Sequence, residues 1–148
     1  MTQTKTPLIT LDDFWPYQAV VLADQISRYT LSVVRAEADL NLSQWRVLAA
    51  VAEAPGRTAA QVTAITPMDK TIVSRAVNSL IDIGFITKIS DTSDKRRSSL
   101  STTTSGEAVY AKVAKHLNAN LITDTAPSKD FTDMLKQFSE KMSDLSGA

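Results

Sequence analysis

Two periodic runs joined by a proline-containing turn constrain the fold of this chain more than any other feature. Apolar residues recur at helical spacing over residues 59–65 and again over 69–83, and Thr66-Pro67-Met68 separates the two runs. Gly84 stands where a helix C-terminal cap is favoured, and residues 85–89 are apolar and β-branched enough to form a strand. The sequence therefore predicts a short helix, a tight turn, a longer helix and a strand, in that order.

The longer of these helices is expected to have one buried side and one polar side. At 100° per residue, Val77 and Leu80 fall within about 60° of Val73, and these residues define the buried side. The opposite side comprises Thr71, Arg75, Asn78 and Asp82, with Ser74 beside them and Lys70 at the start of the helix. Such side chains can reach base edges or phosphates when a helix enters the major groove of DNA.

Further helices and a second strand are expected around this segment. Helical spacing predicts helices over about residues 13–38, 43–54, 104–121 and 128–145. Their expected caps are Ser43, Thr104, in a capping-box pattern with Glu107, and Ser128, and Thr58 is the expected cap of the short helix over residues 59–65. The second strand is expected at residues 98–103, although serine is a poor strand former. The expected fold class is mainly α with a small β-hairpin.

Positive charge is concentrated in the middle of a chain whose formal net charge is zero. Residues 57–97 carry seven cations and four acids, whereas the segments before and after them each contain more acids than cations. Lys95, Arg96 and Arg97 form the densest group and directly follow Asp94. Phosphate binding requires a locally basic surface, so the zero sum does not argue against a nucleic acid partner.

Composition argues against several other classes of protein. With 148 residues, 43% of them apolar, the chain is expected to form one domain. The absence of cysteine excludes disulfides, thiolate zinc sites and thiol redox sensing. No apolar run is long enough to span a membrane and no signal peptide is evident, so a cytoplasmic protein is expected. With His116 as the single histidine and no glycine-rich phosphate loop, no catalytic, metal or cofactor site is expected.

Several short motifs follow one another in a recognisable order. They are Leu42-Ser43-Gln44-Trp45, Val47-Leu48, Met68-Asp69-Lys70, Val73-Ser74-Arg75, Leu80, Gly84, Asp94-Lys95-Arg96-Arg97 and Thr103-Thr104-Ser105-Gly106. Over about residues 12–121, this order resembles the MarR family of bacterial transcription regulators. The sequence departs from the family at Thr102, where a leucine is usual, and this leaves the pairing of the hairpin open.

The resemblance implies a single domain over residues 1–148 with a winged helix-turn-helix lobe over about 41–103. Helices within about 1–40 and 104–148 would form the interface of a homodimer, whose two lobes would read double-stranded DNA at a near-palindromic operator. The residues expected to contact DNA are Asp69, Lys70, Thr71, Ser74, Arg75, Asn78, Asp94, Lys95, Arg96 and Arg97. Lys88 is expected to be an exposed strand residue rather than a specific contact.

The resemblance also suggests a pocket for a small-molecule effector, often an aromatic acid, lined by Trp15, Tyr17, Trp45 and Arg46. The other interpretation of this group is that Trp45 belongs to the core and Arg46 to the surface. The expected function is a repressor of its own or neighbouring genes that such a ligand releases from DNA. The alternatives are a winged-helix adaptor that binds protein instead of DNA and an enzyme, for which the sequence assembles no site.

Overall fold

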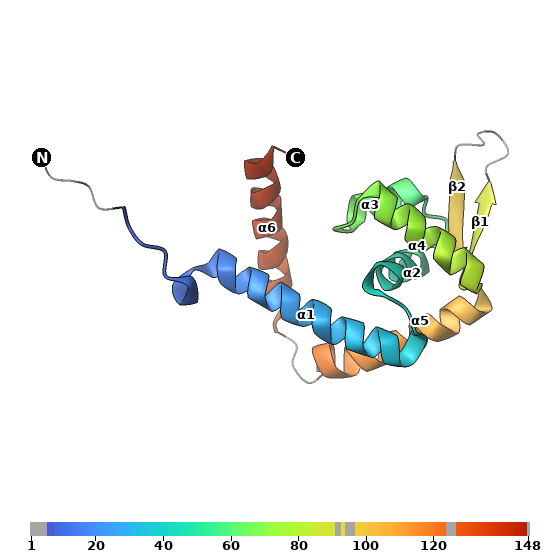
Figure 1. The fold of residues 1–148 in the computed structure, drawn as a ribbon, viewed down its shortest axis with the longest axis horizontal. Coiled ribbons are helices and arrows are strands. Elements are labelled where there is room, and N and C mark those ends of the chain that lie inside the picture. The colour runs from blue at the N-terminus through green and yellow to red at the C-terminus, as the bar shows by residue number, and fades with distance from the viewer. Residues whose placement is uncertain (1–5, 91–92, 94–96, 124–126, 148) are drawn as a thin grey trace, which may run out of the picture. The chain divides into compact units, whose positions relative to one another are not determined.

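A computed structural model describes residues 6–90, 93, 97–123 and 127–147 of the chain. Its elements (Figure 1) are the 3-10 helix η1 (Leu11–Asp13), α1 (Trp15–Ala38), α2 (Leu42–Glu53), α3 (Ala59–Ile65), α4 (Lys70–Ile83), β1 (Ile86–Ser90), β2 (Ser98–Thr102), α5 (Thr104–Asn118), the π-helix η2 (Ala119–Thr123) and α6 (Lys129–Ser146). The predicted fold class, mainly α with a small β-hairpin, is confirmed. The chain divides into two compact units, Met1–Val113 and Ala114–Ala148.

Reciprocal side-chain hydrogen bonds begin both α2 and α3. At α2, the Gln44 N–H donates to Asn41 Oδ1 and the Asn41 N–H donates to Gln44 Oε1, each over 2.8 Å. The prediction of Ser43 as this cap is wrong, because the helix already begins at Leu42 and leaves Ser43 within its first turn. At α3 the predicted cap, Thr58, forms the same kind of box with the residue three positions later.

The limits of α4 are set by its two caps. Asp69 Oδ1 accepts a hydrogen bond from the Ile72 N–H at the first turn. Gly84, the predicted C-terminal cap, has φ of 91°, and its N–H donates to the carbonyls of Leu80 and Ile81. A side chain at this left-handed position would be strained, so glycine ends the helix and turns the chain directly into β1.

The predicted buried side of α4 forms part of the core of the first unit. Val73, Val77 and Leu80 are 1%, 4% and 0% exposed. They pack in a lobe where α2 and α3 both contact α4 and where α2 also contacts β2. Full burial of one such side chain stabilises the fold by roughly 1.5–3 kcal/mol, so this side of α4 is firmly held against the lobe.

The hairpin has a continuous register despite its serines. β1 and β2 pair antiparallel from Ile86 opposite Thr102 to Ser90 opposite Ser98. On its other edge, β2 gains two backbone hydrogen bonds of 2.8 Å: the Leu100 N–H donates to the Arg57 carbonyl, and the Gly56 N–H donates to the Leu100 carbonyl. Because Leu100 is also buried, bonding on both edges and packing outweigh the low strand propensity of serine.

A compact junction joins the hairpin, α4 and α5. The Thr103 hydroxyl donates to the Gly84 carbonyl over 2.6 Å and accepts from the Gly106 N–H over 3.0 Å. The Thr103 N–H donates to the Phe85 carbonyl over 3.0 Å. The predicted cap Thr104 is wrong by one residue, because it is the Thr103 hydroxyl that reaches the free N–H groups of the first turn of α5.

The second unit presents an amphipathic α6. None of its residues is buried, and its large apolar side chains are all exposed: Phe131, Met134, Leu135, Phe138, Met142 and Leu145. An apolar helix face of this size is normally covered by another surface.

Within the described part of the chain, no helix combines the length and apolar character needed to cross a membrane.

The junction predicts that Gly106→Ala destabilises the protein. A β-carbon at Gly106 would lie 2.0 Å from the Phe85 carbonyl oxygen, so α5 and Phe85, the residue before β1, would have to separate. We expect the free energy of unfolding, measured by urea denaturation, to fall by about 2 kcal/mol or more. Ser105→Ala, at the exposed neighbouring position, is the matched control. Equal stability of the two variants would contradict the close approach.

Candidate nucleic-acid interface

The polar side of α4 faces away from the buried residues of its lobe. Lys70, Thr71, Ser74, Arg75 and Asn78 are all exposed, as the sequence predicts for the side opposite the buried residues. These residues include a guanidinium, a carboxamide and two hydroxyls, which can donate hydrogen bonds to base edges and phosphates. The helix therefore presents one continuous hydrogen-bonding face.

Asp69 has a structural role in this helix. Its carboxylate accepts from the Ile72 N–H over 2.9 Å and places a negative charge at the positive end of the helix dipole. This bond fixes where α4 begins and how its first turn is oriented. The carboxylate therefore positions Lys70 and Thr71, independently of any contact with DNA.

Of the predicted wing contacts, one lies within the described structure. Arg97 is exposed at the residue before β2. Asp94, Lys95 and Arg96 lie outside the described residues. The strands that carry this segment are in place, since their register runs out to Ser90 and Ser98, the residues on either side of the loop.

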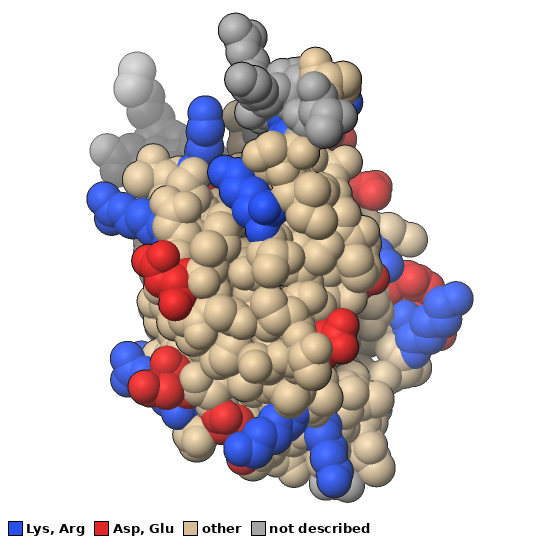
Figure 2. All heavy atoms as spheres, turned by 90° about the vertical axis from the view of Figure 1, so that its right-hand side faces the viewer, with Lys and Arg blue, Asp and Glu red and all other residues tan. Residues whose placement is uncertain are grey.

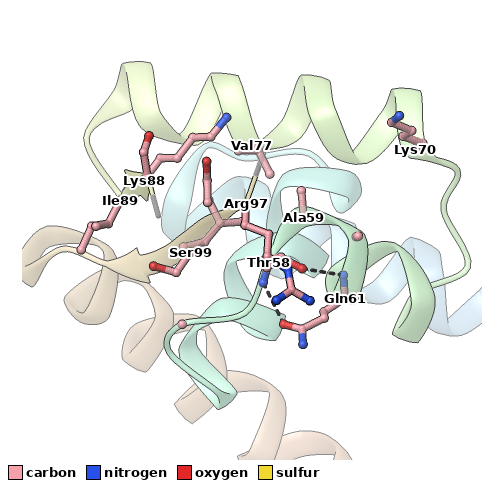
Figure 3. A pocket seen from close by; sticks show the side chains of 14 residues that line it. Thr58, Ala59, Gln61, Lys70, Val77, Lys88, Ile89, Arg97 and Ser99 are labelled. Carbon is pink, nitrogen blue, oxygen red and sulfur yellow. Dashed lines mark hydrogen bonds between the residues drawn. The ribbon is translucent and has the colours of Figure 1, made fainter. Parts of the chain in front are cut away.

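A hollow of about 800 Å³ lies among the start of α3, α4 and the hairpin. We call it the basic hollow because three cations, Lys70, Lys88 and Arg97, line it and none of the described lining residues is acidic. Figure 3 shows these cations around it, on α4, on β1 and just before β2. Thr58 and Gln61 also line it, so the hollow combines positive charge with hydrogen-bonding groups suited to a phosphate.

Lys88 is an exposed strand residue, as predicted. It also lines the basic hollow with Lys70 and Arg97. Successive side chains of a strand point to opposite faces, so Lys88 lies on the same side of β1 as the buried Ile86. Only the packing of that side toward the lobe shows that the ammonium joins two other cations.

Charge is unevenly distributed on the molecule. Figure 2 shows several basic side chains toward the upper end of the face in view. The middle of this face is mostly uncharged, and acidic and basic side chains alternate below it. A neutral chain can therefore still offer a locally positive surface to a polyanion.

A second hollow, of about 430 Å³, lies beside α2 and is called the aromatic hollow after Trp45 and Tyr110, which line it together with Arg46. The two rings stack with centroids 5.6 Å apart and planes 16° from parallel. Trp45 is only 9% exposed, so it also belongs to the core. Tyr110 was missed because 65 residues separate it from Trp45 and only the fold brings them together.

The other two predicted effector residues do not join the aromatic hollow. Trp15 and Tyr17, in the first turn of α1, are 52% and 42% exposed and do not line it. The structure thus separates the four predicted residues into two pairs.

Among the described residues, no group of three or more histidine or acidic side chains is placed to hold a metal ion.

The arrangement of α3, the turn, α4 and the hairpin defines a winged helix-turn-helix protein. A family model described as "MarR family" matches residues 38–97, which span α2 to the end of the hairpin loop. The match covers less than half of the chain, so over this lobe the chain is similar to the MarR family. No curated protein sequence matches the chain significantly.

Solved structures of other proteins share the fold along most of the chain. A regulator from Silicibacter pomeroyi is 20% identical, with 92% of each chain covered and a TM-score of 0.74. Streptococcus pneumoniae FabT, solved in complex with DNA, is 17% identical, with 89% of this chain and 95% of that chain covered and a TM-score of 0.68. Staphylococcus aureus MarR, solved with salicylate and kanamycin, is 18% identical, with 93% of each chain covered and a TM-score of 0.69. At these identities the likeness concerns the fold.

The cap of α4 predicts different effects for two substitutions of Asp69. Asp69→Asn keeps an acceptor for the Ile72 N–H, whereas Asp69→Ala removes it and should lower the free energy of unfolding by about 1 kcal/mol. Chemical denaturation of both variants measures this difference. If Asp69→Ala is as stable as Asp69→Asn, the carboxylate does not hold the start of α4.

Proposed function

We propose that this protein is a dimeric, sequence-specific DNA-binding transcription regulator. The observation that carries the proposal is the juxtaposition of the exposed polar face of α4 with the basic hollow, on one lobe. The wing and α4 can then engage adjacent grooves while a phosphate strand lies between them. Such a role places the protein in the bacterial cytoplasm with its operator.

In this proposal α4 is the recognition helix and lies in the major groove. Arg75 and Asn78 are the residue types that pair bidentately with guanine and adenine, respectively. Lys70, Thr71 and Ser74 contact nearby phosphates or bases, and Asp69 holds the first turn in place. Substitution of Arg75 should therefore change sequence preference more than substitution of a wing residue.

The basic hollow and the wing account for phosphate contacts. Lys70, Lys88 and Arg97 are placed to receive the backbone that runs between α4 and the hairpin. We assign Arg96 to the minor groove, where negative potential attracts arginine, and Lys95 to the adjacent phosphates. Asp94, two residues before Arg96, would orient its guanidinium and so reduce the entropy lost on binding.

The homodimer is supported by the apolar surfaces of the terminal helices. Exposed Leu22 and Ile26 on α1 and the exposed apolar face of α6 require cover, and a second copy would supply it. Two lobes related by a two-fold axis read a near-palindromic operator when their recognition helices lie about one DNA turn apart, roughly 34–36 Å. The proposed role is repression of its own or neighbouring genes.

The aromatic hollow is our candidate site for a releasing ligand. Trp45 and Tyr110 offer ring faces and Arg46 offers a cation, a combination that suits an aromatic carboxylate. A related protein has been solved with salicylate, which belongs to this class of ligand. Such a ligand can release DNA only if it binds the DNA-competent and DNA-incompetent states unequally.

The alternative function is a winged-helix adaptor that binds protein. An adaptor would more readily present an apolar patch on α4, whereas all five exposed candidate residues there carry a charge, an amide or a hydroxyl. Selection of bound DNA from a random pool decides between the two functions. An enriched palindrome supports the regulator, and the absence of enrichment favours the adaptor. Repeating the selection with aromatic acids tests release.

The basic hollow predicts a measurable salt effect. Loss of one phosphate contact lowers the slope of log K against log salt concentration by about 0.9, hence by about 1.8 for a dimer that loses two. We expect Lys88→Ala and Arg97→Ala each to reduce the slope toward this extent in titrations of the selected operator. Arg35→Ala, an exposed cation on α1 that does not line the hollow, is the control. An unchanged slope for Lys88→Ala would remove Lys88 from the interface.

The apolar face of α6 predicts that Leu135→Glu dissociates the dimer. Leu135 is 52% exposed in a single chain, and a carboxylate there would be costly to bury between two copies. We expect sedimentation velocity to show a monomer for this variant. Gln137→Glu adds the same charge on the same helix and should remain dimeric. A dimer for both variants would show that α6 does not form the interface at Leu135.

A further inference from the structure

One exposed residue of α4 does not fit the polar pattern around it. Ile72 is 39% exposed in the first turn of the helix, next to the exposed side chains of Thr71 and Arg75. Every other exposed residue in the first two turns, residues 70–77, is polar or charged. An isoleucine at this position contributes no hydrogen bond or charge to the interface, so its presence there calls for an apolar partner.

The backbone at Ile72 is held by a direct contact. Its N–H donates to Asp69 Oδ1 over 2.9 Å, so the residue belongs to the capped and ordered start of the helix. Side chains on a helix tilt toward its N-terminus, and a β-branched side chain has one strongly preferred χ1 rotamer in a helix. Ile72 therefore projects a stiff apolar surface at the end of α4 that leads into the groove, with little rotamer entropy to lose on binding.

The major groove displays one apolar group, the C5-methyl of thymine. The donors and acceptors along the rest of the groove would lose hydrogen bonds to water if an isoleucine covered them. We propose that Ile72 contacts a thymine methyl in each half-site and so determines specificity at that base pair. This inference rests on the proposed function, because it requires α4 to lie in the major groove.

A second isoleucine on the same helix provides a matched comparison. Ile83 is 48% exposed, but it is the last residue of α4, beside Gly84, and thus at the opposite end of the helix. The two residues share their chemistry, their helix and similar exposure. They differ in position relative to the capped first turn, which is the property that the inference uses.

The test replaces thymine by deoxyuridine in the operator obtained by selection from a random pool, one base pair of the half-site at a time. This replacement removes the C5-methyl and leaves the hydrogen-bonding groups unchanged. For the wild-type protein, one replacement in each half-site removes two methyl contacts from the dimer and should weaken binding by about fifteenfold, since losing one buried methyl-sized group costs about fourfold. For Ile72→Ala, binding to the thymine operator should be weakened and the same replacement should have no further effect.

Two variants and the selection itself separate the possible outcomes. Ile83→Ala should keep the wild-type ratio of affinities for the thymine and deoxyuridine operators. Ile72→Val should keep part of this ratio. Thermal unfolding checks that all variants fold. If wild-type binding is indifferent to every replacement, or if Ile72→Ala keeps the wild-type ratio, the inference about Ile72 is overturned while the regulator stands. If selection enriches no operator, the proposed function fails first and this inference fails with it.

Discussion

Burial of one side of α4 is the constraint on which the rest of the lobe depends. Val73, Val77 and Leu80 are almost fully buried, so the helix cannot rotate about its axis without exposing them. Because the helix cannot rotate, the polar residues on its other side keep facing away from the lobe. A recognition surface needs this property, because side chains that are oriented before binding lose less entropy when they meet the DNA.

The junction at Thr103 extends this constraint to the hairpin and α5. One threonine hydroxyl bridges Gly84, at the end of α4, and Gly106, in the first turn of α5, while its N–H bonds to Phe85. The absence of a β-carbon at Gly106 lets these segments approach closely. A change in the direction of α5 would therefore be felt at the base of the wing and at the C-terminal end of α4. In the proposed regulator, this contact is a physical route by which dimer geometry can affect the DNA-binding surface.

The neutral chain and the basic hollow illustrate why a charge total is a poor guide to partners. Acids and cations are equal in number, yet Lys70, Lys88 and Arg97 converge on one hollow whose described lining contains no acid. They come from the start of α4, from β1 and from the residue before β2. Phosphate affinity depends on such local convergence, and acids elsewhere on the molecule are separated from it by distance and by screening in salt.

The sequence by itself determined the order of elements, the buried side of α4 and the caps at Thr58 and Gly84, because periodicity and capping act over only a few residues. It misplaced the caps of α2 and α5 by one or two residues, since neighbouring polar residues competed for each cap and local pattern alone did not distinguish Asn41 from Ser43. The tertiary structure alone decided the hairpin register, the pairing of Leu100 with Gly56 and Arg57, and the convergence of Lys88 with two other cations. It also decided the stacking of Trp45 on Tyr110. These features depend on contacts between residues distant along the chain, which no local sequence pattern encodes.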